Sequence, residues 1–232
     1  MRYKERGFAL LGLALAILIA SLLVIASINQ NNNNFGQSRN TTKKLTDIKN
    51  ALTSYALANG YFPCPASLTE ALTNSTFASE SRADATSCTT GSGVSLVAAG
   101  TVYHGLVPIK TLGLPNDLSA DEWGNKIEYY VPSDWIDATD NAIPAPLPEV
   151  ITLTDGVGRN VFVPFVVISR GKNGYYAYPL GRSTANSVSS DPEEIQNTAG
   201  NSFIIFENID GFDDLLMYIT NLKLGDLNTN NQ

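Results

Sequence analysis

The sequence predicts an α+β fold in which a long N-terminal helix, half in a membrane and half on a domain, packs on an antiparallel β-sheet with long loops. Two observations predict the helix: Phe8 to Ile28 contains no charged residue, and an apolar period of helical spacing follows. A third predicts the sheet, because β-branched and aromatic residues gather in short segments of the second half. One helix followed by several strands is the α+β pattern.

The N-terminus combines a short basic leader, residues 1–7, with this charge-free run at 8–28. A helix of that length can cross a bilayer. Basic residues before the run favour a cytoplasmic N-terminus, although Arg39, Lys43 and Lys44 follow it. Long domains cross membranes largely regardless of charge. We therefore expect a single-pass membrane protein with its N-terminus in the cytoplasm and its C-terminal domain outside.

Residues 29–59 are predicted to continue the helix and join it to the domain. The stretch Gln30 to Asn34 is nearly all asparagine, so the helix should weaken or bend there. The residues that then mark one apolar helical face are Leu45, Ile48, Leu52 and Tyr55. Asn59-Gly60 is a typical helix stop, because glycine adopts the left-handed conformation easily.

Residues 60–232 are predicted to form one exported globular domain, which is long enough to bury a core. The net charge of -7 argues against a nucleic-acid surface, which needs clustered cations. The expected strands lie at 101–103, 126–131, 149–153, 161–169 and 203–206.

The two cysteines, Cys64 and Cys88, are predicted to form a disulfide because the domain is expected to be exported. The loop that this bond closes would stabilise the fold by about 3 kcal/mol. Metal binding is the alternative, but the chain offers one histidine, His104, far from either cysteine in sequence.

The junction Arg6-Gly7-Phe8-Ala9-Leu10-Leu11 resembles the leader of type IV pilins and type II secretion pseudopilins. In that family a prepilin peptidase cuts after the glycine and methylates the new N-terminal phenylalanine. The resemblance therefore implies processing at Gly7, methylation of Phe8, and a filament subunit rather than an enzyme.

Five further segments resemble this family in the expected order: 51–65, 104–114, 121–129, 165–174 and 212–214. The most specific is Trp123-Gly124-Asn125, which in pseudopilins enters a sheet strand. Its structural interpretation is a core aromatic followed by a turn that admits positive φ, and we prefer this to a ligand role. The Gly171 to Gly174 segment is similarly expected to be a hairpin turn.

One position departs from the family pattern. Type IV pilins usually carry glutamate at the fifth mature position, which is Gly12 here, and the apolar run has no other carboxylate. In the family this glutamate pairs with the terminal amine of a neighbouring subunit, and a buried charge is tolerable only when paired. The absence favours a minor or tip component over a repeating subunit. The alternative is a filament lineage that tolerates the loss.

The sequence contains few signs of a catalytic or metal-binding site. A serine hydrolase would need His104 beside a serine and an acid, and no candidate serine has the Gly-x-Ser-x-Gly spacing of a nucleophile elbow. We therefore expect a structural or exposed histidine and no enzyme. Calcium binds several carboxylate oxygens, but no EF-hand spacing is present. Solvated loop charge is the default interpretation, so we expect no cofactor. If Ca²⁺ binds, the candidate ligands are Asp191, Glu193, Asp210 and Asp213.

The functional hypothesis is a minor pilin- or pseudopilin-like subunit of a type II secretion or type IV pilus filament that assembles through its N-terminal helix. Its expected partners are other pilin subunits, prepilin peptidase, the inner-membrane assembly platform and the lipid bilayer, with no nucleic acid. The resemblance implies a place in the bacterial inner membrane with the C-terminal domain in the periplasm, and in a pilus or pseudopilus after assembly. The runner-up is an anchored or secreted periplasmic binding domain, since residues 24–27 loosely fit an ordinary signal-peptidase site. A membrane-tethered hydrolase is a third alternative that lacks a catalytic constellation.

Overall fold

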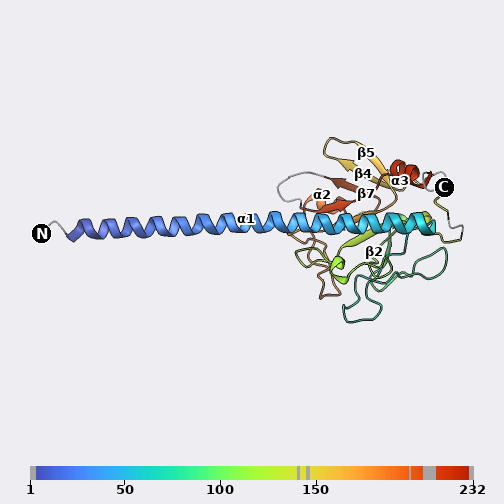
Figure 1. The fold of residues 1–232 in the computed structure, drawn as a ribbon, viewed down its shortest axis with the longest axis horizontal. Coiled ribbons are helices and arrows are strands. Elements are labelled where there is room, and N and C mark those ends of the chain that lie inside the picture. Colours follow the sequence, from blue (N-terminus) through green and yellow to red (C-terminus); the bar gives the residue numbers. More distant parts are fainter. Residues whose placement is uncertain (1–3, 140–141, 145–146, 199, 206–212, 230–232) are drawn as a thin grey trace. The chain divides into compact units, whose positions relative to one another are not determined.

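The chain forms two compact units, Met1–Asn40 and Thr41–Gln232. A computed structural model describes the backbone of residues 4–139, 142–144, 147–198, 200–205 and 213–229 (Figure 1). Side chains are described over the same ranges except at 4–14, 23–34, 222 and 229. All described strands belong to the second unit.

Helix α1 spans Lys4–Asn59. It runs through the asparagine-rich stretch at 30–34, where we expected weakening. Each asparagine costs less than about 1 kcal/mol relative to alanine, which is too little to end a helix. The helix ends as predicted: Gly60 follows Asn59 with a φ of +83°.

The helices correct the predicted localisation in the inner membrane. Of the expected membrane segment, side chains are described for residues 15–22. Across the described part of the chain, no helix combines the length and the apolar character that crossing a membrane requires. On this finding the predicted localisation is wrong.

The last turns of α1 contribute to the main core of the Thr41–Gln232 unit. Their fully buried apolar residues are Leu45, Ile48, Leu52 and Ala56, whereas the predicted Tyr55 is half-buried. Lys44 Nζ forms an ion pair with Glu122 Oε1 at 2.9 Å and donates to the Ala120 carbonyl at 3.0 Å. These polar contacts hold α1 to the loop that precedes the sheet strand at 128–132.

The larger sheet has five strands in the order β1-β2-β3-β6-β8, and every neighbouring pair is antiparallel. The strands are β1 (Ser95–Val97), β2 (Val102–Leu106), β3 (Glu128–Pro132), β6 (Val166–Ser169) and β8 (Leu215–Met217). All residues of β3 and β6 are buried, so both faces of the sheet are covered there. The predicted strand at 161–169 is two strands, because Pro164 lacks the N–H that would continue the ladder.

The second sheet has three strands in the order β5-β4-β7. These are β4 (Ile151–Asp155), β5 (Asn160–Val163) and β7 (Ser202–Ile205). Strand β4 pairs antiparallel with β5 and parallel with β7. The predicted architecture of one long helix packed on a single antiparallel sheet is therefore wrong: there are two sheets, and one of them is mixed.

Two hydrophobic cores explain why a second sheet forms. Tyr129 and Val167 face the core that contains the buried residues of α1, whereas Tyr130 and Ile168 face the opposite way. Alternate strand residues point to opposite faces. The second core is completed by residues of β4, β5 and β7, including Phe203. The apolar side chains on the outer face of β3 and β6 thus require the second sheet as a cover.

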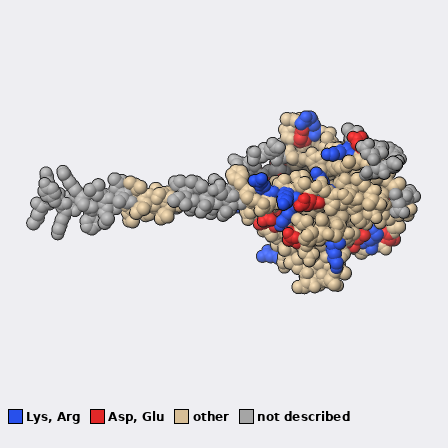
Figure 2. All heavy atoms as spheres, in the orientation of Figure 1, with Lys and Arg blue, Asp and Glu red and all other residues tan. Residues whose placement is uncertain are grey.

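The remaining described helices are short. They are α2 (Pro192–Gln196), α3 (Asn221–Thr229) and the 3-10 helices η1 (Ala98–Gly100), η2 (Asn116–Ser119) and η3 (Ser133–Trp135). On the face shown in Figure 2, acidic and basic side chains are interspersed over the domain rather than gathered into one field.

The turn before β3 is joined to the turn after β6. Gly124 has the expected positive φ of +83°, and Asp121 Oδ1 accepts from the Asn125 N–H at 2.8 Å. Asn125 Nδ2 donates to the Gly171 carbonyl at 3.1 Å. Trp123 is only half-buried, so the prediction that it is a core aromatic is wrong. The fully buried tryptophan is Trp135.

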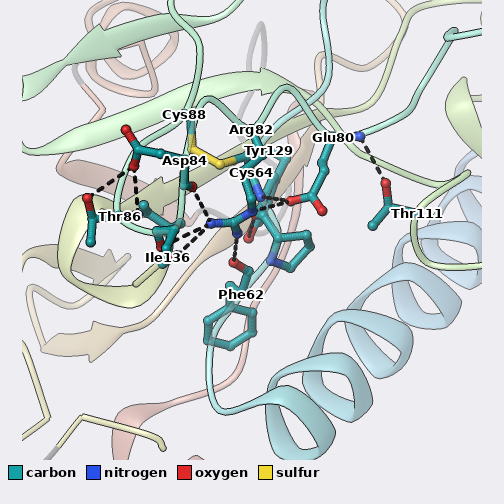
Figure 3. Close-up of a disulfide and its surroundings, with 12 residues drawn as sticks. Phe62, Cys64, Glu80, Arg82, Asp84, Thr86, Cys88, Thr111, Tyr129 and Ile136 are labelled. Carbon is teal, nitrogen blue, oxygen red and sulfur yellow. Dashed lines mark hydrogen bonds and ion pairs between the residues drawn. A yellow bond between two sulfur atoms is a disulfide. The ribbon is translucent and has the colours of Figure 1, made fainter. Parts of the chain in front are cut away.

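The predicted disulfide is present between Cys64 and Cys88, with Cα atoms 5.6 Å apart (Figure 3). Glu80 Oε2 accepts from the Cys64 N–H and from Arg82 Nε, each at 3.0 Å. Arg82 Nη1 donates to the Ile136 carbonyl at 3.0 Å. The bond and the Glu80–Arg82 pair together attach the long 60–94 segment to the core.

Candidate metal centre

The predicted processing site lies outside the part of the chain whose side chains the structure describes. Gly7, Phe8 and Gly12 lie within the bounds of α1, but their side chains are outside the described part of the structure. Processing, methylation and the consequence of the missing glutamate stay predictions.

The predicted calcium ligands that the structure describes, Asp191, Glu193 and Asp213, do not come together as a set. Asp191 caps α2, where its Oδ1 accepts from the N–H groups of Glu193 at 3.0 Å and Glu194 at 3.4 Å. Glu193 is partly exposed, and Asp210 lies outside the described residues. Of the three predicted residues that the structure describes, Asp213 alone belongs to the acidic group that the structure assembles.

That group, called the acidic cluster here, consists of Glu194, Asp213 and Asp214. Each residue offers one carboxylate oxygen, and these oxygens all lie within 4.8 Å of one another. Glu194 is fully buried and Asp214 is 5 % exposed. Three carboxylates are thus held at ligand spacing; Glu194 and Asp214 are buried, and Asp213 is partly exposed.

Local sequence explains how Glu194 enters the cluster. Asp191 and Pro192 start α2 as an N-cap and a first-turn proline, both typical of helix beginnings. The cap sets the helical phase, so Glu194 points inward while Glu193 remains partly exposed. The same cap leaves the carboxylate of Asp191 bound to the backbone.

Strand pairing positions the two aspartates. Asp213 and Asp214 immediately precede β8, whose Leu215 pairs with Ser169 at the end of β6. The chain after β6 turns at Gly171, which has a φ of +58°. A Cβ at Gly171 would collide with the Asp213 carbonyl, so this glycine permits the close approach of the two segments.

Each carboxylate of the cluster uses one oxygen in a described hydrogen bond and leaves the other bare. Asn173 donates through Nδ2 to Glu194 Oε1 at 2.7 Å and through its backbone N–H to Asp213 Oδ2 at 2.8 Å. Asn197 Nδ2 donates to Asp214 Oδ2 at 2.9 Å. Among the described residues, the buried atoms Glu194 Oε2, Asp213 Oδ1 and Asp214 Oδ1 have no hydrogen-bond partner.

Burial and mutual repulsion perturb the acidity of the cluster. Burial, reinforced by the charge of Asp214, raises the pKa of Glu194 to about 7. Burial raises the pKa of Asp214 to about 6, even though Arg170 opposes that shift. Burial also raises the pKa of Asp213. The charges of Arg170 and Lys172 oppose these pKa shifts but do not outweigh burial.

A chain of polar contacts links the cluster to the larger sheet. Arg170 Nη1 lies 3.5 Å from Asp214 Oδ2, and Arg170 Nη2 lies 2.8 Å from Glu128 Oε2. Glu128 Oε2 also lies 3.0 Å from His104 Nε2. Burial alone would raise the pKa of Glu128, but Arg170 and His104 outweigh it and lower that pKa to about 2.

His104 is nearer to a serine and an acid than its sequence context indicated. Ser95 Oγ lies 3.2 Å from His104 Nδ1, because the two residues are paired across β1 and β2. The His104 ring stacks on Tyr130 with centroids 4.2 Å apart. Since Arg170 also pairs with Glu128, we interpret this arrangement as a cross-strand polar ladder. The structural role of His104 stays a prediction.

Sequence reasoning missed Glu194 and Asp214. The adjacent pairs 193–194 and 213–214 were visible, but only the phase of α2 decides which glutamate is buried. The Asp191-Pro192 cap was the signal that could have fixed this phase.

Comparisons of the chain with models of protein families, with curated proteins and with solved structures find no match.

Proposed function

We propose that the chain is a minor pilin- or pseudopilin-like subunit of a type II secretion or type IV pilus-type filament, and that it assembles through its N-terminal helix. The observation that carries the proposal is the Arg6-Gly7-Phe8 junction directly followed by a charge-free run. The proposal names other pilin subunits, prepilin peptidase and an assembly platform as partners. Gly12, at the usual glutamate position, favours a minor or tip place.

The exposed apolar residues of α1 support assembly through this helix. In the described part of the first unit, Leu15, Ile17, Leu18, Ile19 and Leu22 are each between 51% and 64% exposed. A helix that is apolar on all sides is normally buried. Helices of neighbouring subunits would cover these side chains in a filament core.

The contact between two family-like segments gives further support. The 121–129 and 165–174 segments are far apart in sequence, yet Ser169 Oγ donates to Asp121 Oδ2 at 2.7 Å and Asn125 contacts Gly171. Both segments resemble pseudopilins independently, and one structural unit contains both. If either resemblance were a coincidence, there would be no reason to expect the two segments to be in contact.

Intact mass spectrometry of the protein from its native host tests the processing step. The expected mass is that of residues 8–232 with the disulfide and one added methyl group. Fragmentation should place the methyl group on the amine of Phe8. Expression in a host without a prepilin peptidase is the control and should give a chain that retains residues 1–7. A mature chain that begins at Ser27 would support the secreted binding domain instead.

Cross-linking tests assembly separately. A Leu18→Cys variant should form disulfide-linked pairs with a cysteine variant of a sister subunit at the equivalent depth, because these helices would be adjacent. Val188→Cys is the matched control, since Val188 is 72% exposed but lies on the domain. Equal cross-linking at both positions, or none at Leu18 in assembled filaments, would contradict helix-mediated assembly.

A further inference from the structure

We infer that a groove between the C-terminal part of α1 and α3 is a docking site for an extended, acidic segment of a partner protein, and that Lys49 and Lys223 bind the carboxylates of that segment. The inference does not depend on the filament proposal. It rests on the composition of the groove, on its unpaired positive charge, and on the open edge of the neighbouring strand β8.

The groove has a volume of about 440 Å³, which lies within the range of ligand-binding pockets. Its lining comes from α1, from the 217–220 segment that joins β8 to α3, and from α3. All three belong to the Thr41–Gln232 unit. Met217, Ile219 and Leu227 give the groove an apolar surface, to which Lys49 and Lys223 add two cations. A mostly apolar surface with a few polar groups is typical of binding pockets.

The two ammonium groups of the groove lack counter-charges. In the described part of the chain, no carboxylate lies within ion-pair distance of Lys49 or Lys223, and no aspartate or glutamate lines the groove. By contrast, Lys44 on the same helix α1 pairs with Glu122. The chain as a whole carries a net charge of -7, so two unpaired cations in one groove are a local exception. Such a patch attracts and orients a partner that places negative charge there.

The edge of the larger sheet favours a peptide as the occupant. Strand β8 is the last strand of that sheet and pairs with β6. Its other side has no strand partner among the described residues, and the groove begins at Met217, the last residue of β8. An extended peptide can add a strand to such an edge through backbone hydrogen bonds. A lipid or a small anion would bind the cations but could not continue the ladder.

An array of short peptides tests the inference on full-length protein. Each peptide has about six residues and combines two glutamates with valine and threonine in all orders, and a second array carries glutamine instead of glutamate. We expect a subset of the glutamate peptides to bind, their glutamine counterparts to bind about fivefold to tenfold more weakly, and the affinity to fall as salt rises. Absence of binding to every glutamate peptide, or equal binding of the glutamine peptides, would overturn the inference.

The paired substitutions Lys49→Gln and Lys223→Gln test the site. Together they should weaken the best peptide about fivefold to tenfold. Lys43→Gln with Arg159→Gln is the matched control, since it removes two exposed positive charges that do not line the groove. Equal weakening in both double variants would show general charge attraction and overturn the assigned site. If the groove variant failed to fold, Lys223→Gln alone would give the readout, because Lys223 is exposed.

Two measurements test the mode of binding. Methylating the backbone amides of alternate peptide residues should weaken binding about fivefold for one set and little for the other, because one side of an added strand faces β8. A photoreactive group on the peptide should cross-link to residues 49–53 or 217–227. Equal effects of both methylated sets, or cross-links elsewhere on the domain, would overturn strand addition at this groove.

Inorganic phosphate and phosphatidylglycerol vesicles test the other occupants. Neither should displace the peptide at an equal concentration. Displacement by phosphate would indicate a site for small anions, and displacement by vesicles would indicate a lipid site; either result would overturn the choice of a protein partner. The filament proposal is tested by the mass of the mature chain, so either idea can fail while the other stands.

Discussion

Arg170 and Asp214 form a buried ion pair, with Nη1 and Oδ2 3.5 Å apart, between the turn after β6 and the residue before β8. Arg170 also holds Glu128 of β3 at 2.8 Å. One guanidinium therefore connects three segments: β3, the turn after β6, and the residue that precedes β8. Both of its acidic partners are almost completely buried, so each depends on Arg170 for charge compensation.

Replacing Arg170 by methionine should destabilise the protein by about 3–5 kcal/mol, because Glu128 and Asp214 would remain buried without their cation. Urea unfolding followed by circular dichroism measures this loss. Arg159→Ala is the control: the Arg159 side chain is 80% exposed and pairs with Asp155 at the surface, so stability should hardly change. A loss equal to that of the control would show that the buried pair contributes little.

Stability should fall as pH rises from about 4 to 7 in the absence of divalent ions. Burial raises the pKa of Glu194 to about 7 and that of Asp214 to about 6, so the folded state keeps protons that the unfolded state has released. Each such proton changes the free energy of unfolding by up to about 1.4 kcal/mol per pH unit. Urea midpoints measured with EDTA across this range provide the test. Glu194→Gln should reduce the dependence of stability on pH. An unchanged dependence in this variant would contradict the raised pKa of Glu194.

The opposite dependence is expected at acid pH. Arg170 and His104 outweigh burial and lower the pKa of Glu128 to about 2, so its stabilising contribution is present above about pH 4.5. This contribution is lost as pH falls from 4.5 towards 2. Glu128→Gln should remove that part of the acid transition, as monitored by tryptophan fluorescence. An acid limb identical to that of the wild type would show that other carboxylates control it.

Gly171→Ala should be strongly destabilising. Its φ is +58°, and the new Cβ would meet the Asp213 carbonyl. Gly158→Ala is a matched control with a φ of +80° and open space around the Cβ position, so it carries the backbone strain alone, about 1 kcal/mol. Thermal unfolding should show a larger loss for Gly171→Ala. Equal losses would mean that the turn relaxes freely away from Asp213.

Breaking the disulfide should lower stability by about 3 kcal/mol, since Cys64 and Cys88 are 24 positions apart. The paired Cys64→Ser and Cys88→Ser substitutions should melt at a lower temperature than the oxidised wild type. A reductant should lower the wild type in a similar way and leave the double variant unchanged. A reductant effect on the double variant would point to a cause other than this bond.

Several features were predictable because they depend on local sequence. The buried face at Leu45, Ile48 and Leu52 follows from helical spacing, and the stop at Gly60 follows from glycine chemistry. The disulfide was predictable because the chain has two cysteines and an expected exported domain.

The second sheet was not predictable from such patterns. Strands β3 and β6 are apolar on both faces, but their sequence does not say what covers each face. The β4–β7 pairing joins segments separated by two other strands and a helix, and no local signal specifies that partner. Similarly, Trp123 and Trp135 differ in burial only through tertiary packing. The acidic cluster was predicted only in part. Asp213 was named as a candidate ligand, but the helical phase of α2, which buries Glu194, was not used.

The parallel β4–β7 ladder also bears on the order of folding. Thr152 of β4 pairs with Ser202 of β7, so the pair forms only when the loop between these two residues closes. Closing so long a loop has a high entropic cost, which is met before any contact compensates it. The β1–β2 hairpin and the β4–β5 hairpin need only short loops and can form early. The three-stranded sheet is therefore expected to close last, and until then the apolar outer face of β3 and β6 stays open to water. This interval is when the chain is most exposed to aggregation and to proteases.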